Sequence, residues 1–88
     1  MTDEEARRIA IALVDAELER LRGLGPVAVR ELESRSPVER DEGGIVVATS
    51  VQDEGERLMV LVDARRGRRM LATGGFAMAL DGSTHTPH

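Results

Sequence analysis

The chain has 88 residues, 41% of them hydrophobic and 32% charged, and its 12 Arg and 16 acidic residues give a formal net charge of −4. This length allows one small domain at most, and the composition is too apolar for a disordered chain. No apolar run approaches the roughly 18 residues that a membrane span requires. Because the chain has no cysteine, thiol nucleophiles, disulfides and thiolate metal sites are excluded. We therefore expect a small globular domain, for which dimerisation would supplement a limited core.

The first residues carry the signals of a helix near residues 3–22. Thr2 and Glu5 fit a capping box, in which each side chain accepts from the other residue's amide. At the far end, Gly23 is suited to the left-handed conformation that ends helices, and Pro26 prevents continuation. One broad apolar face repeats at three- and four-residue spacing: Ala6, Ile9, Ala10, Leu13, Val14, Leu18 and Leu21.

The rest of the chain predicts strands. Val27 and Val29 alternate within a first strand over residues 27–32, and a polar loop or edge follows through residues 37–44. A second strand is expected over residues 45–51 and a third over residues 58–63. The third is apolar at successive positions, so we expect it to be central, with the helix on one face and other material on the opposite face.

A tight hairpin is expected over residues 63–67, held by the Asp63 side chain and by Gly67 at a positive φ. A fourth strand should run from Arg68 to about Thr73 and end at Gly74-Gly75. Residues 76–80 form either a fifth strand or a helical turn.

These elements predict an α+β fold, an N-terminal helix packed on a four- to five-stranded antiparallel sheet in two layers. Residues 1–81 are expected to be a single domain and residues 82–88 a flexible C-terminal tail. The acidic N-terminus has no apolar signal segment, so the sequence predicts a cytoplasmic protein.

Basic residues gather at the predicted hairpin: Arg65, Arg66, Arg68 and Arg69. They form a solvated hairpin tip, a contact for an acidic protein or a phosphate contact for nucleic acid. Nucleic acid is disfavoured because Phe76 is the single aromatic residue and stacking platforms are therefore nearly absent.

Acidic residues precede and follow the second predicted strand. If the two loops lie at one end of the sheet, they form an acidic patch that could mask a basic toxin or mimic nucleic acid; otherwise they are solvated loops. The first group is Glu39, Asp41 and Glu42, and the second is Asp53, Glu54 and Glu56.

Glu17 falls near the middle of the apolar helix face. We expect it to pair with Arg20 or Arg7 at the edge of the face, or else to be a buried functional acid. His85 and His88 have a spacing that could clip a metal ion on a helix, but Pro87 lies between them. The glycine pairs match no nucleotide-binding motif. We assign no catalytic, cofactor-binding or metal residue.

Segments along the chain resemble the immunity protein 35 family, also called YrhB-like. The resemblance rests on the helix, the 27–29 strand, the Gly44-Ile45-Val46-Val47 strand and the hairpin from Val60 to Gly67, and it covers most of residues 3–73. It implies a helix-first α+β domain that inhibits a bacterial toxin without catalysis, and no catalytic residue carries over.

The sequence therefore predicts a small non-enzymatic protein-binding module that presents a sheet face or charged loops, and the resemblance implies an immunity-like toxin inhibitor. The apolar surplus on the helix and the third strand motivates this prediction. A homodimeric structural or accessory subunit is the alternative. A third hypothesis is a small-molecule binder or enzyme between helix and sheet, which requires a buried Glu17 with a raised pKa.

Overall fold

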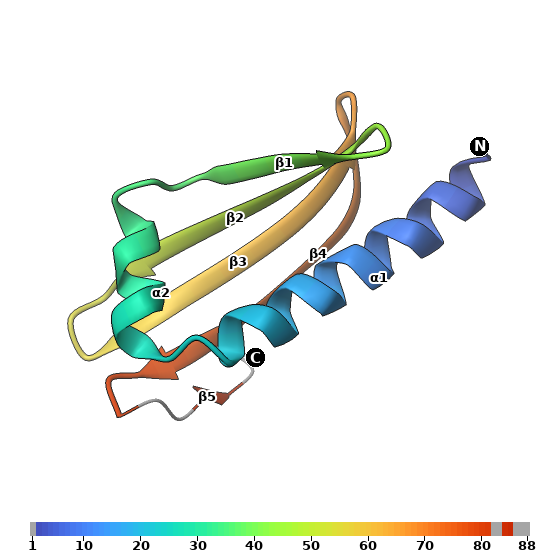
Figure 1. Cartoon of the computed structure of the whole chain (residues 1–88). Helices are drawn as coiled ribbons and strands as arrows, with labels where there is room; N and C mark the ends of the chain where they lie inside the picture. Colours follow the sequence, from blue (N-terminus) through green and yellow to red (C-terminus); the bar gives the residue numbers. More distant parts are fainter. Residues whose placement is uncertain (1, 82–83, 86–88) are drawn as a thin grey trace.

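The computed structural model describes residues 2–81 and 84–85. The strands form one antiparallel sheet in chain order, and both helices lie on the same face of it (Figure 1). The predicted α+β architecture, an N-terminal helix packed on an antiparallel sheet, is confirmed. The elements are α1 (Asp3–Arg22), α2 (Pro26–Glu33), β1 (Val38–Glu42), β2 (Ile45–Asp53), β3 (Arg57–Arg66), β4 (Arg69–Ala79) and β5 (Thr84–His85).

Helix α1 has the predicted bounds. The Glu5 amide donates to the Thr2 hydroxyl at 3.2 Å, which satisfies an otherwise free donor of the first turn. The left-handed residue after the helix is Gly25, with φ 83°, whereas Gly23 keeps a helical φ of −77°. Most of the predicted apolar face is buried against β3 and β4, although Ile9 is exposed. The buried apolar residues are Ala6, Ala10, Val14, Leu18 and Leu21.

The prediction of a strand over residues 27–32 is wrong, because this segment is helix α2. Pro26 opens the helix, where its fixed φ is favourable and its missing N–H costs nothing. Alternation would place Val27 and Val29 on one face. In the helix they diverge, so that Val29 is fully buried while Val27 is exposed to solvent. Packing of Val29 and Leu32 on the core outweighs the weak strand preference of the two valines.

Ser36 ties the end of α2 to the sheet. Strand β1 begins at Val38 opposite Thr49, so it does not reach the Val51 amide. The Ser36 hydroxyl accepts from that amide at 2.8 Å and is 3.2 Å from the Leu32 carbonyl, to which it donates. A side chain thus replaces the missing ladder partner.

We expect Ser36→Ala to lower the free energy of unfolding by about 1–2 kcal/mol, because it leaves a part-buried amide without an acceptor. Ser34→Ala is the control, since the Ser34 hydroxyl makes an exposed bond to the Glu31 carbonyl. Urea denaturation measures both variants. Equal stabilities of the two variants would contradict this role for Ser36.

The β3–β4 hairpin differs from its prediction in two respects. Gly67 has the expected positive φ, 61°, but Asp63 lies within β3 opposite Thr73 and does not hold the turn. Strand β4 also continues through Gly74-Gly75 and ends at Ala79, so the two glycines do not break it. A Cβ on Gly74 would lie 2.9 Å from Leu18 Cδ1. This glycine therefore allows α1 to pack closely on β4.

Strand β3 is the third of the five strands, and its central position confirms the prediction. Its side chains alternate between the helix-covered face and the opposite face, which we call the open face. The covered face buries Leu58, Val60, Val62 and Ala64, while the open face carries Met59, Leu61, Asp63 and Arg65. The helices cover one face as predicted, but neither of them lies on the open face (Figure 1).

Within the segment predicted to be a flexible tail, residues 84–85 pair with β4 as the short strand β5. The rest of that segment, including His88, lies outside the described residues. In the part of the chain that is described, no helix has the length and apolar character needed to cross a membrane.

Candidate functional site

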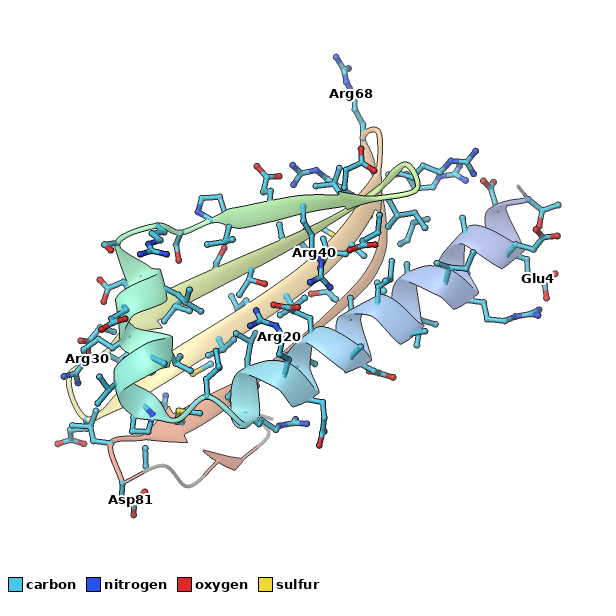
Figure 2. The ribbon with its side chains drawn as sticks, in the orientation of Figure 1. Glu4, Arg20, Arg30, Arg40, Arg68 and Asp81 are labelled. Atoms are coloured by element: carbon cyan, nitrogen blue, oxygen red, sulfur yellow. The ribbon has the colours of Figure 1, made fainter. Side chains whose placement is uncertain are left out.

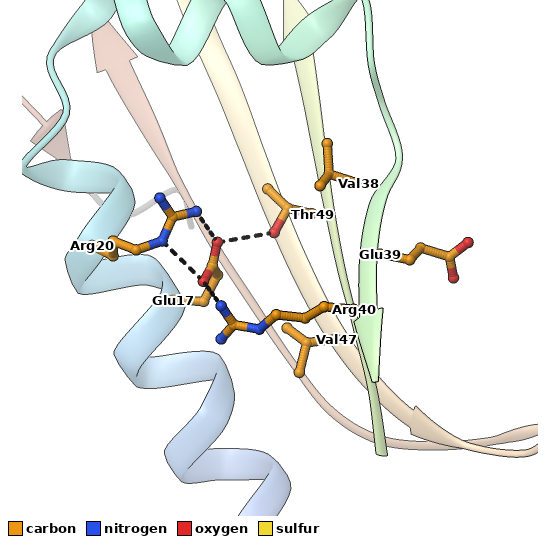
Figure 3. Close-up of a pocket in the computed structure, with 7 residues that line it drawn as sticks. All are labelled: Glu17, Arg20, Val38, Glu39, Arg40, Val47 and Thr49. Atoms are coloured by element: carbon orange, nitrogen blue, oxygen red, sulfur yellow. Dashed lines mark hydrogen bonds and ion pairs between the residues drawn. The ribbon is translucent and has the colours of Figure 1, made fainter. Parts of the chain in front are cut away.

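A cleft of about 90 Å³ lies between α1 and the outer strands β1 and β2 (Figure 3). Its centre is the carboxylate of Glu17, whose side chain is only 5% exposed. Helix α1 supplies two charged residues, Glu17 and Arg20, and β1 and β2 supply the opposite wall. The lining residues are Glu17, Arg20, Val38, Glu39, Arg40, Val47 and Thr49.

Two arginines and a hydroxyl converge on Glu17 (Figure 3). Arg20 binds it in a bidentate manner, with Nη2 2.5 Å from Oε1 and Nε 3.2 Å from Oε2. From β1, Arg40 Nη1 lies 3.3 Å from Oε2, and the Thr49 hydroxyl donates to Oε1 at 3.5 Å. A second carboxylate, that of Glu42, forms an ion pair with Arg40, with Oε1 3.2 Å from Nε. The cations in the cleft are therefore already paired with acids of the same chain.

These contacts lower the pKa of Glu17 below its ordinary value of 4.5. The hydrogen bond from Arg20 is the main cause and opposes the desolvation that would raise the pKa, and the nearby charges of Arg20 and Arg40 add to it. A general acid at neutral pH needs a raised pKa. Although Glu17 is buried, the condition for the small-molecule or enzymatic hypothesis is therefore not met, and Glu17 instead joins α1 to the edge strand.

The Glu17–Arg20 pair was one of the two pairings predicted from the sequence. Arg40 was not, because it lies 23 positions further on and reaches Glu17 only through the pairing of β1 with β2. Arg40 and Val38 are two positions apart on β1, so both side chains lie on the covered face. This spacing is the signal that could have identified Arg40.

The predicted arginine cluster is divided between the two faces of the sheet. Arg65 pairs with Glu39 on the open face, whereas Arg69 pairs with Asp3 at the start of α1. Arg66 shares the covered side with Arg69, its cross-strand partner. Arg68 lies in the turn and extends away from the body of the protein (Figure 2). The four residues share one end of the sheet but do not form one continuous basic surface.

The two predicted acidic groups do not converge. Glu39, Asp41 and Glu42 lie on β1 near the turn at Gly43-Gly44, close to the β3–β4 hairpin (Figure 1). Because β2 runs the full length of the sheet, the second group, residues 53–56, lies at the opposite end. Two members of the second group make local ion pairs, Asp53 with Arg30 and Glu54 with Arg57. The condition for a shared acidic patch is not met.

The open face combines small and apolar side chains. Leu61 is 52% exposed and Met70 is 54% exposed. The neighbouring positions opposite Leu61 are Ser50 on β2 and Gly75 on β4, so little surrounds this leucine. Leu61 and Met70 are separated on this face by the Asp63–Thr73 pair. We treat the uncovered face as the candidate interaction surface.

Asp63 lies at the centre of this face, between Ala48 of β2 and Thr73 of β4. Asp63 is half-buried, and its Oδ1 atom is buried and accepts no hydrogen bond. Among the described residues, no other buried side-chain oxygen or nitrogen lacks a hydrogen-bond partner. Such atoms are rare in native proteins because each costs the free energy of its lost hydration. The sequence did not indicate it, since Asp63 was assigned to the turn.

Within the described residues, no cluster of three His, Asp or Glu side chains could hold a metal ion. Comparison of the chain with family models, with curated proteins and with solved structures found no match in any of the three. The site is therefore interpreted from its own residues.

Proposed function

We propose that this protein is a non-enzymatic protein-binding module that presents the open face of its sheet to another protein. The observation that carries the proposal is the exposed side chain of Leu61, near the middle of a sheet face that neither helix covers. Burying such a surface provides the main driving force for protein association. The cleft at Glu17 supports a structural role instead, because its charges are satisfied within the chain.

A bacterial toxin is the partner class that we propose within this function. This part rests alone on the resemblance of most of residues 3–73 to the immunity protein 35 family. The segment at residues 27–29 does not support that resemblance, because it is helix α2 and not a strand. An inhibitor of this kind acts by covering its target, so it needs a surface and no catalytic group. The open face would supply that surface.

The alternative is a homodimeric structural or accessory subunit. The edge strand β1 opposes edge-to-edge dimerisation, since all five of its residues are exposed and four are charged. In a symmetric antiparallel pairing centred on Arg40, Glu39 would face Asp41 of the second copy, and like charges would repel. If a homodimer forms, we therefore expect it to use the open face and not the β1 edge.

We expect Leu61→Gln to weaken partner binding about tenfold or more, because it removes an exposed apolar anchor. The matched control is Ala12→Gln, which changes an exposed residue of α1. Each variant, expressed at the native level in the original host, is purified with its partner and the stoichiometry is measured. Recovery of the wild-type chain alone, or equal partner retention by both variants, would contradict the proposal.

A further inference from the structure

We infer that the open face binds a basic protein segment, whose Arg or Lys side chain pairs with Asp63 while its apolar side chains cover Leu61. This inference rests on the proposed function and specifies the partner's chemistry. It is supported by the charge balance of the face, by the state of the Asp63 carboxylate and by the arrangement of its neighbours.

The half of the open face nearest the β1–β2 turn is acidic. Glu39, Ala48 and Asp63 are successive cross-strand neighbours, so their side chains point to the same face. Asp41 and Arg65 flank this row through Val46. This half of the open face therefore carries three carboxylates and one guanidinium, that of Arg65. At the other end of the face, Arg57 is paired with Glu54 and adds no free positive charge.

Among these carboxylates, Asp63 is distinguished by its partners. Glu39 is paired with Arg65, and Asp41 accepts from the Gly44 amide at 2.7 Å within the turn. Asp63 has no donor for its buried Oδ1. A charge that is already partly removed from water loses less hydration when a partner covers it, so the attraction of an incoming cation is less offset.

The surroundings of Asp63 give a partner access. Ala48 and Thr73 lie beside it on the neighbouring strands, and Gly75 lies opposite Leu61. These small side chains leave the Asp63 carboxylate and the Leu61 side chain accessible from the open face. A segment with a basic and an apolar side chain two positions apart would match this spacing, because residues 61 and 63 are separated by one strand period and share a face.

The same charge balance argues against the two other occupants. A second copy would bring a second set of three carboxylates against the first, which costs repulsion. Nucleic acid would bring phosphates against an acidic face. Self-association is an outcome that the test distinguishes.

The direct test titrates the isotope-labelled full chain with three defined probes, followed by the amide resonances of Leu61, Asp63 and Thr73. The probes are acetyl-Leu-Ala-Arg-Ala-Leu-amide, acetyl-Leu-Ala-Gln-Ala-Leu-amide and acetyl-Leu-Ala-Glu-Ala-Leu-amide, in which the central residue and the leucines share one face of an extended chain. We expect the Arg peptide to shift these resonances with a Kd on the order of millimolar, as small ligands with few contacts do. Asp63→Asn should weaken this binding about tenfold, which corresponds to one charge-assisted bond. Asp15→Asn, at an exposed position of α1, is the matched control that should leave it unchanged.

The outcomes separate this inference from the proposed function. Equal shifts by the Arg and Gln peptides, lost in Leu61→Gln but kept in Asp63→Asn, would overturn the basic partner while leaving the binding face in place. Absence of shifts on the open face with all three peptides would contradict both. Shifts that map to the Glu17 cleft, or concentration-dependent self-association through this face, would overturn the inference in favour of another surface or a second copy.

A second measurement uses the free protein alone. If Asp63 serves to bind a partner, it destabilises the free protein, in which that partner is absent. Asp63→Thr should therefore raise the melting temperature of the free protein by roughly 4 °C, because threonine suits a central strand and needs no charge partner. A lower melting temperature for Asp63→Thr would show that the aspartate stabilises the free fold and would contradict its assignment to the interface.

Discussion

Replacing Glu17 with alanine is expected to lower the free energy of unfolding by about 2–4 kcal/mol. The Glu17 side chain is 5% exposed and joins two arginines, one on α1 and one on β1. Without it, both guanidiniums lose the carboxylate that they share, and the helix loses its ion pair with the edge strand. The arginines are themselves 53% and 44% exposed, so water partly compensates them and the effect stays in this range. Urea denaturation at pH 7 measures the difference.

The pH dependence of the same site tests whether the charge of Glu17 provides this stability. Because folding lowers its pKa below 4.5, the folded state binds the proton less tightly than the unfolded state. The stabilisation is therefore complete well above pH 4.5 and is lost as the pH falls through the lowered pKa. The stability difference between wild type and Glu17→Gln should be constant near neutral pH and shrink in acid.

Glu19→Gln is the control for this pH series, because Glu19 is an exposed residue on the same helix, 82% accessible and 3.8 Å from Arg22. Its difference from wild type should stay small throughout. A Glu17→Gln difference that does not change between neutral and acidic pH would show that Glu17 acts by packing and not by its charge.

Replacing Gly75 with alanine is expected to cost about 3 kcal/mol of folding stability, near the upper end of overpacking effects. A Cβ at this position would lie 2.6 Å from the Val60 carbonyl oxygen and 2.9 Å from Leu61 Cδ2. The carbonyl belongs to the backbone of the central strand, so it cannot move without distorting the β3–β4 ladder. Chemical denaturation gives the stability, and amide exchange along β3 reports the local distortion.

Gly74→Ala is the matched comparison at the next position. Its new Cβ would meet Leu18 Cδ1 at 2.9 Å and Val14 Cγ1 at 3.2 Å, which are ends of side chains that can adjust. We expect a smaller loss, about 1 kcal/mol. If Gly74→Ala proved the more damaging of the two, the helix contact and not the strand backbone would be what requires the glycine pair.

The elements that the sequence predicts well are those with local signals. The α1 helix has a cap, a 3.6-residue period and a terminating glycine and proline, so its bounds follow from the chain alone. The two misread segments depend on tertiary contacts. Helix α2 is short and is fixed by burial of Val29, and β4 continues through its glycines because α1 and β3 need the space.

The candidate site was less predictable for the same reason. Glu17 was identified because a carboxylate interrupts an apolar helix face, but its partner Arg40 comes from a distant strand. The sequence predicts Asp63 to be a turn residue because an aspartate that can hold the turn by its side chain, together with a glycine at a positive φ, here Gly67, is typical of hairpins. Its role depends on the register of three strands, and no local pattern encodes that register.

The claim that the open face binds another protein is tested most directly by photo-crosslinking from that face. A benzoylphenylalanine at position 61, in the full chain expressed at its native level in the original host, should give one discrete adduct with a different protein. The same group at position 12, on the exposed side of α1, should not give that adduct, and Asp63→Arg should abolish it by placing like charges in contact. No adduct from position 61, the same adduct from both positions, or an adduct that contains only two copies of this chain would contradict the account.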